Sequence, residues 1–376
     1  MEAIDKYIDY LMENSTPDRP IWNIEKLKAG AVSGWNYIDG CMIKAILEMY
    51  NITQDKKYLD FADGFIDAKV NDDGSINGYK VEEMNIDNVN AGKTLFELYD
   101  ITGKEKYRKA IDLVYSQIEG MPRTADGNFW HKDIYPNQVW LDGLYMGQPF
   151  YMEYETRFND CKNYDDIFSQ FKNVIRDMRD YRSGLYYHAM DTTKEMFWCD
   201  KVTGLSSHFW LRALGWYTMA LLDTLDKAKA EVAGDDYEVL KDAFKDLIDA
   251  MLNYQDESGM WYQVVNLGGM DRNYLETSGS SIMAYGILKG VRLGFLDESY
   301  IQYGKKAFDG VVEKYLKTEE DGNIHLGGIV LVGGLGGKQE RPGTYDYYMS
   351  EPIVSDDAKG VGPFLLAYTE MKRLDK

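Results

Sequence analysis

The sequence has few basic residues for its length and no long apolar run, and each shortage excludes a class of protein. Its 376 residues include 42 lysines and arginines against 62 aspartates and glutamates, a formal net charge of −20. Because such a surface repels a phosphate backbone, we expect no nucleic acid partner. No apolar run is long enough to span a bilayer, so we expect no membrane partner either. The opening residues, MEAIDKYIDYLMENS, lack the basic patch and apolar core of a signal peptide.

Cysteine is scarce, and the common metal-binding motifs are lacking. The three cysteines have neither disulfide nor metal-site spacing, which favours a reducing, cytoplasmic location: Cys41, Cys161 and Cys199. The motifs HExxH and CxxC and the acidic calcium loop do not occur, so we expect neither a metal nor another cofactor.

A glycine-rich run, residues 327–340, does not match a phosphate-binding loop. Val332 stands where that loop needs glycine, and Gln339 replaces its serine or threonine. We interpret the run as a flexible flap at the mouth of a site, in which Lys338 or Arg341 reaches the ligand.

The sequence does contain enough apolar and aromatic residues for a large core. Apolar residues make up 45 % of it, and it has 30 tyrosines, 14 phenylalanines and 8 tryptophans, which argues against disorder. The length alone suggests about two or three domains. Internal repeats instead predict a single catalytic domain over residues 1–376.

Two kinds of helical stretch alternate along the chain. Five begin near a tyrosine and have apolar residues at i, i+3, i+4 and i+7, so we expect surface helices at 55–69, 104–118, 163–178, 236–251 and 298–316. Six are apolar or small nearly all round, so we expect buried helices at 35–50, 85–101, 140–155, 207–225, 277–291 and 359–374. With residues 2–13 as the sixth outer helix, the pattern predicts an all-α (α/α)6 toroid of six inner and six outer helices.

The connections between these helices are unequal in length, and this predicts where a site lies. Links from outer to inner helices are long, and most carry a turn followed by an aromatic residue, at Asp73-Gly74, Asp126-Gly127, Ser183-Gly184, Ser258-Gly259 and Asp321-Gly322. Such turns predict short β-hairpins. The long loops then share one face with the N-termini of the inner helices, whose positive potential allows an acidic protein to bind an anion.

Three aspartates stand in the first turns of otherwise apolar inner helices, where a charge is costly unless it is paired or hydrated. Asp142 is the main candidate for catalysis, because a carboxyl group among aromatic side chains keeps its proton more readily, as a general acid must. Gly143 beside it is expected to leave room for a substrate. For Asp87, helix capping is an alternative. For Asp39, a cap or a structural ion pair competes equally with a role in substrate binding.

Basic and aromatic side chains predicted at the same face suit an acidic sugar. Arg212 and Trp216 lie one helical turn apart and so share a face of the fourth inner helix. A guanidinium can bind a carboxylate through two hydrogen bonds, while indoles stack on the sugar ring. His131 and Lys132 precede the third inner helix, and His188 lies in the next hairpin. For each histidine, a structural hydrogen bond is the alternative.

Several strings of the sequence occur together in one known family. FWHKDIYPNQVWLDGLYMGQPF, YYHAMD, FWLRALGWYTMALLD and YYMSEPIVSDDAKGVGPFLLA closely resemble the unsaturated rhamnogalacturonyl hydrolases, glycoside hydrolase family 105, from about Trp35 to the C-terminus. The resemblance implies an (α/α)6 barrel, a catalytic aspartate at Asp142 and a second pocket aspartate at Asp87. With Asp39 added from its position, the expected substrate-binding residues are His188, Arg212, Trp216, His131, Lys132, Trp140, Trp210 and Asp39.

The activity that the resemblance implies is removal of a 4-deoxy-4,5-unsaturated uronate from the non-reducing end of lyase-generated pectin oligosaccharides. Such a sugar is an enol ether. Protonation of C4 makes an oxocarbenium-like centre at C5, water adds there, and the hemiketal opens to release the neighbouring sugar. One carboxyl group can be the acid to C4 and then the base to the water. We expect Asp142 to do this, Asp87 to orient hydroxyls or water, and Arg212 to hold the carboxylate.

The residues leave other functions open. An ordinary inverting glycosidase on the same barrel would use Asp87 and Asp142 as its acid and base. An unsaturated glucuronyl hydrolase would act on fragments of other polysaccharides. A non-catalytic glycan-binding scaffold and a sugar epimerase are further alternatives. The expected partner is a small oligosaccharide, and we expect a monomer or a weak homo-oligomer.

Overall fold

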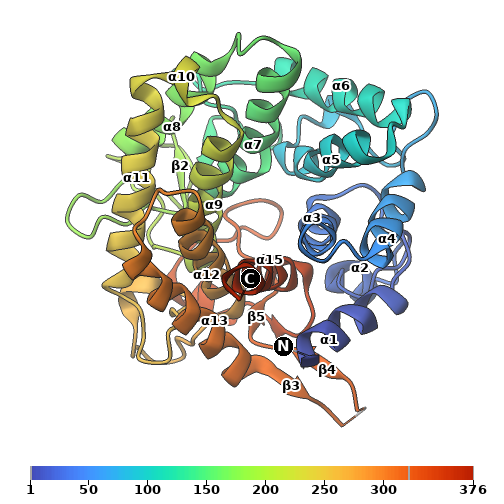
Figure 1. Ribbon diagram of the computed structural model, residues 1–376. Helices are drawn as coiled ribbons and strands as arrows, with labels where there is room; N and C mark the ends of the chain where they lie inside the picture. Colours follow the sequence, from blue (N-terminus) through green and yellow to red (C-terminus); the bar gives the residue numbers. More distant parts are fainter. Residues whose placement is uncertain (1, 321, 376) are drawn as a thin grey trace.

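The chain folds as two concentric rings of helices (Figure 1). The computed structural model describes residues 2–320 and 322–375. In this part of the chain, the inner ring consists of α3 (Tyr37–Thr53), the 3-10 helix η2 (Ile86–Gly92) continued by α5 (Lys93–Thr102), α7 (Leu141–Phe158), α9 (Leu211–Lys227), α12 (Thr277–Arg292) and α15 (Ala358–Leu374). The outer ring consists of α1 (Glu2–Glu13), α4 (Lys56–Asp67), α6 (Glu105–Gly120), α8 (Tyr164–Met178), α11 (Asp235–Leu252) and α13 (Ile301–Tyr315). The predicted (α/α)6 toroid is confirmed.

The two rings follow from two kinds of helix surface. The outer helix α8 buries one apolar stripe that includes Ile167, Phe171 and Val174, and it turns its charged side chains outward. The inner helix α12 is buried at every residue from Thr277 to Gly290. A helix with one apolar stripe needs one packing partner, whereas a helix without a polar face needs neighbours on every side. The single-domain organisation stays a prediction.

The N-terminal helix α1 closes the outer ring against the last inner helix. Tyr368 of α15 donates its hydroxyl to Asp5 Oδ1 at 2.9 Å.

Two inner helices begin differently from the prediction. The fourth inner helix starts at Leu211, because Trp210 is extended and forms a bridge with Val264. The second inner helix starts as the 3-10 helix η2, capped by the side chain of Asn85.

Short strands connect the long loops. Among the described residues, β1 (Gln138–Trp140) pairs with β2 (Ala189–Asp191), β3 (Leu316–Thr318) with β4 (Ile324–Leu326), and β5 (Ile329–Val330) with β6 (Ile353–Val354), all antiparallel. Only β3–β4 of these is a hairpin, and Asp321 in its turn lies outside the described residues. Three other predicted turns close through single bridges around Gly74, Gly127 and Gly184, whose φ angles of 88°, 92° and 77° suit glycine. Shorter helices complete the chain: α2 (Ile24–Lys28), α10 (Ala230–Ala233), α14 (Tyr345–Ser350), η1 (Val81–Glu83), η3 (Val265–Leu267) and η4 (Glu298–Tyr300).

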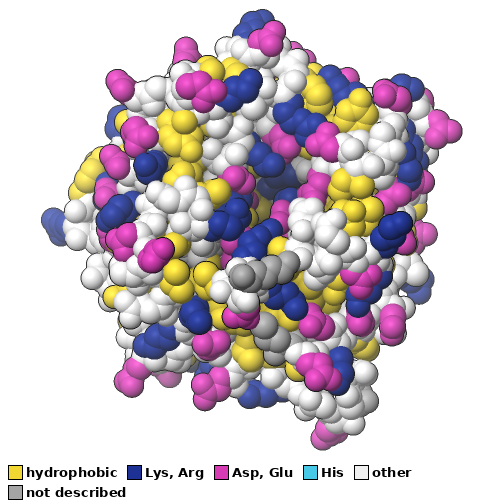
Figure 2. Space-filling view, in the orientation of Figure 1, with side chains coloured by type: hydrophobic (Ala, Val, Ile, Leu, Met, Phe, Trp, Pro, Cys, Tyr) yellow, Lys and Arg dark blue, Asp and Glu magenta, His cyan; other side chains and the backbone are white. Residues whose placement is uncertain are grey.

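Ion pairs join the C-terminal ends of the inner helices into a closed belt. Figure 2 views this end of the toroid, where basic and acidic side chains surround a central hollow. Every neighbouring pair of inner helices is linked, by Lys44–Glu97, Asp100–Arg157, Glu153–Lys227, Asp223–Lys289, Arg292–Glu370 and Arg373–Glu48, with N···O distances from 2.5 to 3.2 Å. Cations near helix C-termini also complement the helix dipoles. No helix in the described residues is both long and apolar enough to cross a membrane.

Candidate active site

The N-terminal ends of four inner-ring elements surround a cavity of about 230 Å³. Tyr37 begins α3, and Asp87, Asp142 and Arg212 are the second residues of η2, α7 and α9. The cavity is smaller than the roughly 300–1,000 Å³ that hold drug-sized ligands, so it suits a single sugar ring. Its lining is completed by Glu25, His131, Lys132, Tyr135, Trp140, Met146, Trp210, Trp216, Val332, Gly333, Gly334 and Arg341.

Asp142 is held at the start of α7 by the pairing of two long loops. Trp140 of β1 lies opposite Ala189 of β2, and Leu141 N donates to His188 O at 3.1 Å. This brings Asp142 Oδ2 to 3.3 Å from His188 Nε2. The carboxyl oxygen is buried and has no hydrogen-bond partner, and no lysine or arginine of the described chain pairs with it. Asp142 therefore brings a carboxyl group without a cation partner to the cavity.

His188 stands behind Asp142 and does not line the cavity. Its side chain is fully buried, and its Nδ1 lies 2.7 Å from the hydroxyl of Tyr348 in α14. The ring packs on Trp210, with centroids 4.7 Å apart. Because the hydrogen bond at one ring nitrogen sets the protonation of the other, Tyr348 governs what Nε2 offers to Asp142. The sequence predicts that His188 contacts the substrate, whereas in the structure His188 contacts the carboxyl group of Asp142.

Asp87 has the cation partner that Asp142 lacks. Lys132 Nζ lies 2.6 Å from Asp87 Oδ2, and His131 Nε2 lies 3.6 Å from Oδ1. Burial by itself raises the pKa of Asp87, but Lys132 and His131 outweigh burial and hold the pKa below its ordinary value. Burial lowers the pKa of His131 to about 4, so this imidazole is neutral near neutral pH. The capping role falls to Asn85, whose side chain accepts from Asp87 N at 3.1 Å.

Arg212 brings a buried positive charge to the cavity wall. Its Nη1 donates to Val330 O at 2.6 Å, and its Nη2 donates to Leu331 O at 3.4 Å, so it also holds the flap, here residues 327–341. None of its hydrogen bonds among the described residues goes to a carboxylate. Of the two flap cations predicted to reach a ligand, Arg341 lines the cavity and Lys338 does not. The two guanidinium groups favour an anionic ligand.

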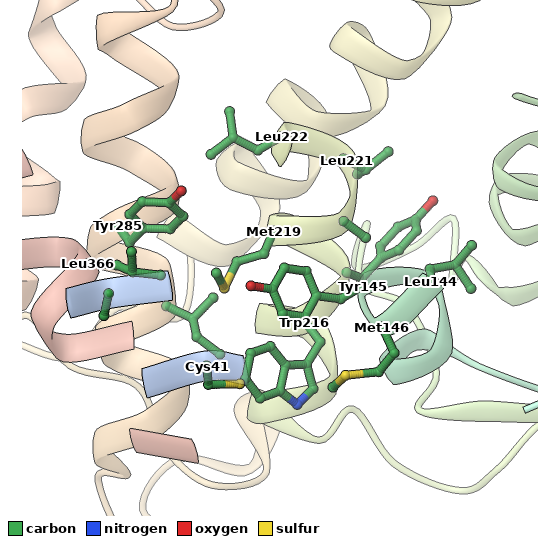
Figure 3. Close-up of a cluster of buried hydrophobic side chains, with 14 of the residues drawn as sticks. Cys41, Leu144, Tyr145, Met146, Trp216, Met219, Leu221, Leu222, Tyr285 and Leu366 are labelled. Atoms are coloured by element: carbon green, nitrogen blue, oxygen red, sulfur yellow. The ribbon is translucent and has the colours of Figure 1, made fainter. Parts of the chain in front are cut away.

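Aromatic rings form the walls and the floor of the cavity. Trp140 stacks on His131 with centroids 4.5 Å apart and 6° between the planes, and Tyr135 stacks on Trp140 at 5.3 Å. Trp216 lies deeper along α9 and stacks on Tyr145 at 5.0 Å and 7°. Figure 3 shows this pair among packed apolar side chains of the inner helices. The cavity is therefore closed below, and a ligand enters from the loop face.

Two predictions about single residues differ from the structure. A Cβ atom on Gly143 would lie 2.9 Å from His131 Nδ1, so this glycine makes room for His131 and not for a substrate. Asp39 lies outside the cavity lining. It accepts a hydrogen bond from Trp22 Nε1 at 3.0 Å and faces Lys69 Nζ at 3.8 Å. Asp39 thus ties α3 to segments before and after it in the chain, which is the structural alternative.

Sequence reasoning misses several residues of the site: Glu25, Tyr37, Tyr135, Met146 and Tyr348. Met146 follows Asp142 by one helical turn, so helical spacing was a usable signal for it. Glu25 and Tyr348 come from the short helices α2 and α14, and no local pattern marks them.

Fold and site together define a toroidal protein whose small, charged cavity is suited to one acidic ring. Three carboxyl groups, two guanidinium groups and several indoles face the same small cavity, and the two aspartates among the carboxyl groups differ in whether a cation pairs with them. Among the described residues, no group of three or more His, Cys, Asp or Glu side chains is placed to hold a metal ion.

Comparisons with known proteins give the family. The model of Glycosyl Hydrolase Family 88 matches residues 3–375. A solved family 105 glycoside hydrolase of C. acetobutylicum ATCC 824 is 44 % identical with a TM-score of 0.90, over 98 % of this chain and 99 % of that one. The chain therefore belongs to Glycosyl Hydrolase Family 88 as that model defines it and, with this relative, to family 105. It is a glycoside hydrolase.

The chain is also similar to more distant proteins. The unsaturated rhamnogalacturonyl hydrolase YesR of Bacillus subtilis (strain 168) is 24 % identical over 296 residues, which are 77 % of this chain and 78 % of that protein. The unsaturated glucuronyl hydrolase of Bacillus sp. GL1 has a TM-score of 0.66 at 14 % identity, over 91 % of this chain and 88 % of that one. The latter likeness concerns the fold.

Proposed function

We propose that this enzyme hydrates the C4=C5 double bond of an unsaturated uronate at the non-reducing end of an oligosaccharide, and so releases the neighbouring sugar. The observation that carries the proposal is the contrast between its two cavity aspartates. Asp87 is neutralised by Lys132 at 2.6 Å, whereas Asp142 has no lysine or arginine partner in the described chain. A carboxyl group that must first give and then take a proton cannot be held permanently ionised by a cation.

Each of these cavity residues has its own part in the proposed reaction. Asp142 donates its proton to C4, the π electrons form the new C–H bond, and positive charge develops at C5 and the ring oxygen. Water attacks C5 and gives a proton back to Asp142. The hemiketal then opens, and the remaining hemiacetal at C1 expels the neighbouring sugar. Asp87, which stays ionised, orients hydroxyls or the water, and Arg212 and Arg341 hold the uronate carboxylate.

One relative supports rhamnogalacturonan fragments as the substrate class. YesR is named an unsaturated rhamnogalacturonyl hydrolase, and it aligns over 77 % of this chain. The proposed substrate is therefore an unsaturated galacturonyl residue linked to a sugar such as rhamnose. A cytoplasmic location and a monomeric or weakly associated state stay predictions.

A spectroscopic assay tests this proposal. The conjugated double bond absorbs in the ultraviolet, and hydration abolishes the absorbance. We expect the absorbance to fall with unsaturated disaccharides and no cleavage of the matched saturated disaccharides. An ordinary inverting glycosidase that uses Asp87 and Asp142 would give the opposite result. Asp142→Asn should lower turnover by roughly 10²–10⁴-fold with an unchanged circular dichroism spectrum. Unaltered turnover in this variant would exclude Asp142 as the proton donor.

A further inference from the structure

A lysine of the inner ring completes the hydrogen bonding of the helix that carries Asp142. In an α-helix the carbonyl of Tyr145 would accept from the backbone N–H four residues later, but that residue is Pro149, which has no N–H. Lys93, the first residue of α5, supplies the missing donor, because its Nζ donates to Tyr145 O at 3.0 Å. This hydrogen bond joins the inner element that carries Asp87 to helix α7.

The same ammonium packs against the aromatic floor of the cavity. Lys93 Nζ lies 3.4 Å from the centroid of the Tyr145 ring, which is close enough for a cation–π interaction. Tyr145 in turn stacks on Trp216, which lines the cavity, whereas Tyr145 and Lys93 do not line it. Figure 3 shows Tyr145 and Trp216 as neighbours deep between the inner helices. A positive charge therefore lies behind the floor of the cavity.

Among the described residues, no carboxylate pairs with Lys93, whose hydrogen bond goes to a backbone oxygen. Lys44 and Lys289 each pair with two carboxylates. Burial is the main reason why the pKa of Lys93 falls to about 7, and Lys44 and Lys289 lower the pKa further. Asp223 of α9 and Cys41 of α3 oppose this decrease. The Lys93 ammonium is therefore charged below neutral pH and neutral above it.

We infer that Lys93 is a positioning residue for the uronate: it holds the floor made by Tyr145 and Trp216 and gives this floor a positive charge that attracts the anionic ring. This inference rests on the proposed function. In that function Arg212 and Arg341 hold the carboxylate directly, whereas Lys93 acts through the two rings. Two charges inside a protein attract each other more strongly than they would at the same separation in water. An unsaturated uronate should therefore bind more tightly while Lys93 is charged.

The pH dependence of KM tests the role of the charge. In the ultraviolet assay with an unsaturated disaccharide, we compare the KM of Lys93→Met with that of the wild type. This ratio should be roughly threefold to tenfold larger near pH 5.5 than near pH 8.5, because only the wild type loses a charge between them. Lys93→Arg stays charged and should keep a low KM throughout. Lys245→Met is the matched control, since it removes an exposed lysine of the outer helix α11 and should give a ratio that is constant with pH.

The missing N–H of Pro149 tests the role of the hydrogen bond. Pro149→Ala restores a backbone donor for the carbonyl of Tyr145. Lys93→Met should therefore lower the melting temperature by at least about 2 °C less in the Pro149→Ala background than in the wild-type background.

Equal losses of melting temperature in the two backgrounds, or a KM ratio that is constant with pH, would overturn the inference while the proposed function stands. If Lys93→Met does not fold, Lys93→Arg decides, since a KM that rises with pH as in the wild type would overturn the inference. A wild type that consumes no unsaturated substrate would overturn the proposed function and the inference together.

Discussion

Tyr348 and Asp142 contact opposite nitrogens of one imidazole. The hydroxyl of Tyr348 lies 2.7 Å from His188 Nδ1, and Asp142 Oδ2 lies 3.3 Å from His188 Nε2. His188 and Tyr348 are both fully buried. The tautomer of a buried histidine follows from the hydrogen bonds available to it, so we propose that a residue from α14 acts on the carboxyl group of Asp142 through His188. Tyr348 is therefore a positioning residue.

Tyr348→Phe should lower kcat with little change in KM. The variant keeps the ring that packs on Trp210 but loses the hydroxyl that orients His188. Loss of such an orienting partner is expected to lower kcat by about tenfold and to change the pH profile of kcat. Tyr345→Phe is the control, because the hydroxyl of Tyr345 donates to Asp271 O at the surface. A pH profile and kcat equal to those of the wild type would assign Tyr348 to packing alone.

Lys132→Met should move the acid limb of the pH–activity profile to higher pH. Lys132 and His131 hold the pKa of Asp87 low against the effect of burial, so in the wild type Asp87 stays ionised well into the acid range. Without Lys132 the pKa of Asp87 rises, and the limb should shift upward by roughly one to three pH units. The limb is read from kcat/KM across pH. Lys132→Arg keeps the charge and should leave the pH of the acid limb unchanged. A shift of equal size in both variants would refute this explanation.

Glu48→Gln should destabilise the toroid most at neutral pH. Burial raises the pKa of Glu48, but Lys44 and Arg373 outweigh burial and hold it well below its ordinary 4.5. A group whose folded pKa is lowered contributes stability above its unfolded pKa and loses that contribution as pH falls through the folded value. The variant should therefore lose about 1–3 kcal/mol of unfolding free energy near pH 7, and the difference from the wild type should shrink in acid.

The measurement for the ion-pair belt is chemical denaturation at several pH values. Lys6→Met is its control, because the pair of Lys6 with Glu2 is exposed and lies outside the belt. Such an exposed pair contributes little to the free energy of unfolding. A loss in Glu48→Gln that is no larger than in Lys6→Met, or that is constant with pH, would show that the belt does not stabilise the ring.

The helices could be predicted from the sequence because their signals are local. The apolar stripe of α8 and the apolar or small residues all round α12 each follow from about fifteen consecutive residues, and alternation of the two kinds predicts the rings. Asp142 and Arg212 could be found in the same way, as charges in apolar helices. The belt of ion pairs was not predicted, since each link joins residues of different helices.

The parts of the site that local reasoning missed depend on long-range contacts. Tyr348 is 160 positions from His188, and no pattern near either residue marks the hydrogen bond between them. The glycine at 143 looks like space for a substrate until His131 is seen to fill that space. Asp39 looks like Asp87 in sequence, but Trp22 and Lys69 reach only Asp39. Burial and partner, rather than residue type, separate a structural carboxylate from a catalytic one.

The most direct test of the central claim is the site at which solvent hydrogen enters the product. With an unsaturated disaccharide in deuterium oxide, protonation by Asp142 should place one carbon-bound deuterium at C4 of the released uronate as the ultraviolet absorbance disappears. Mass spectrometry and proton NMR at early times measure the deuterium and its position. Asp142→Asn should slow the incorporation and the absorbance change by the same factor. Release of the neighbouring sugar with the absorbance intact and no carbon-bound deuterium would contradict hydration of the double bond.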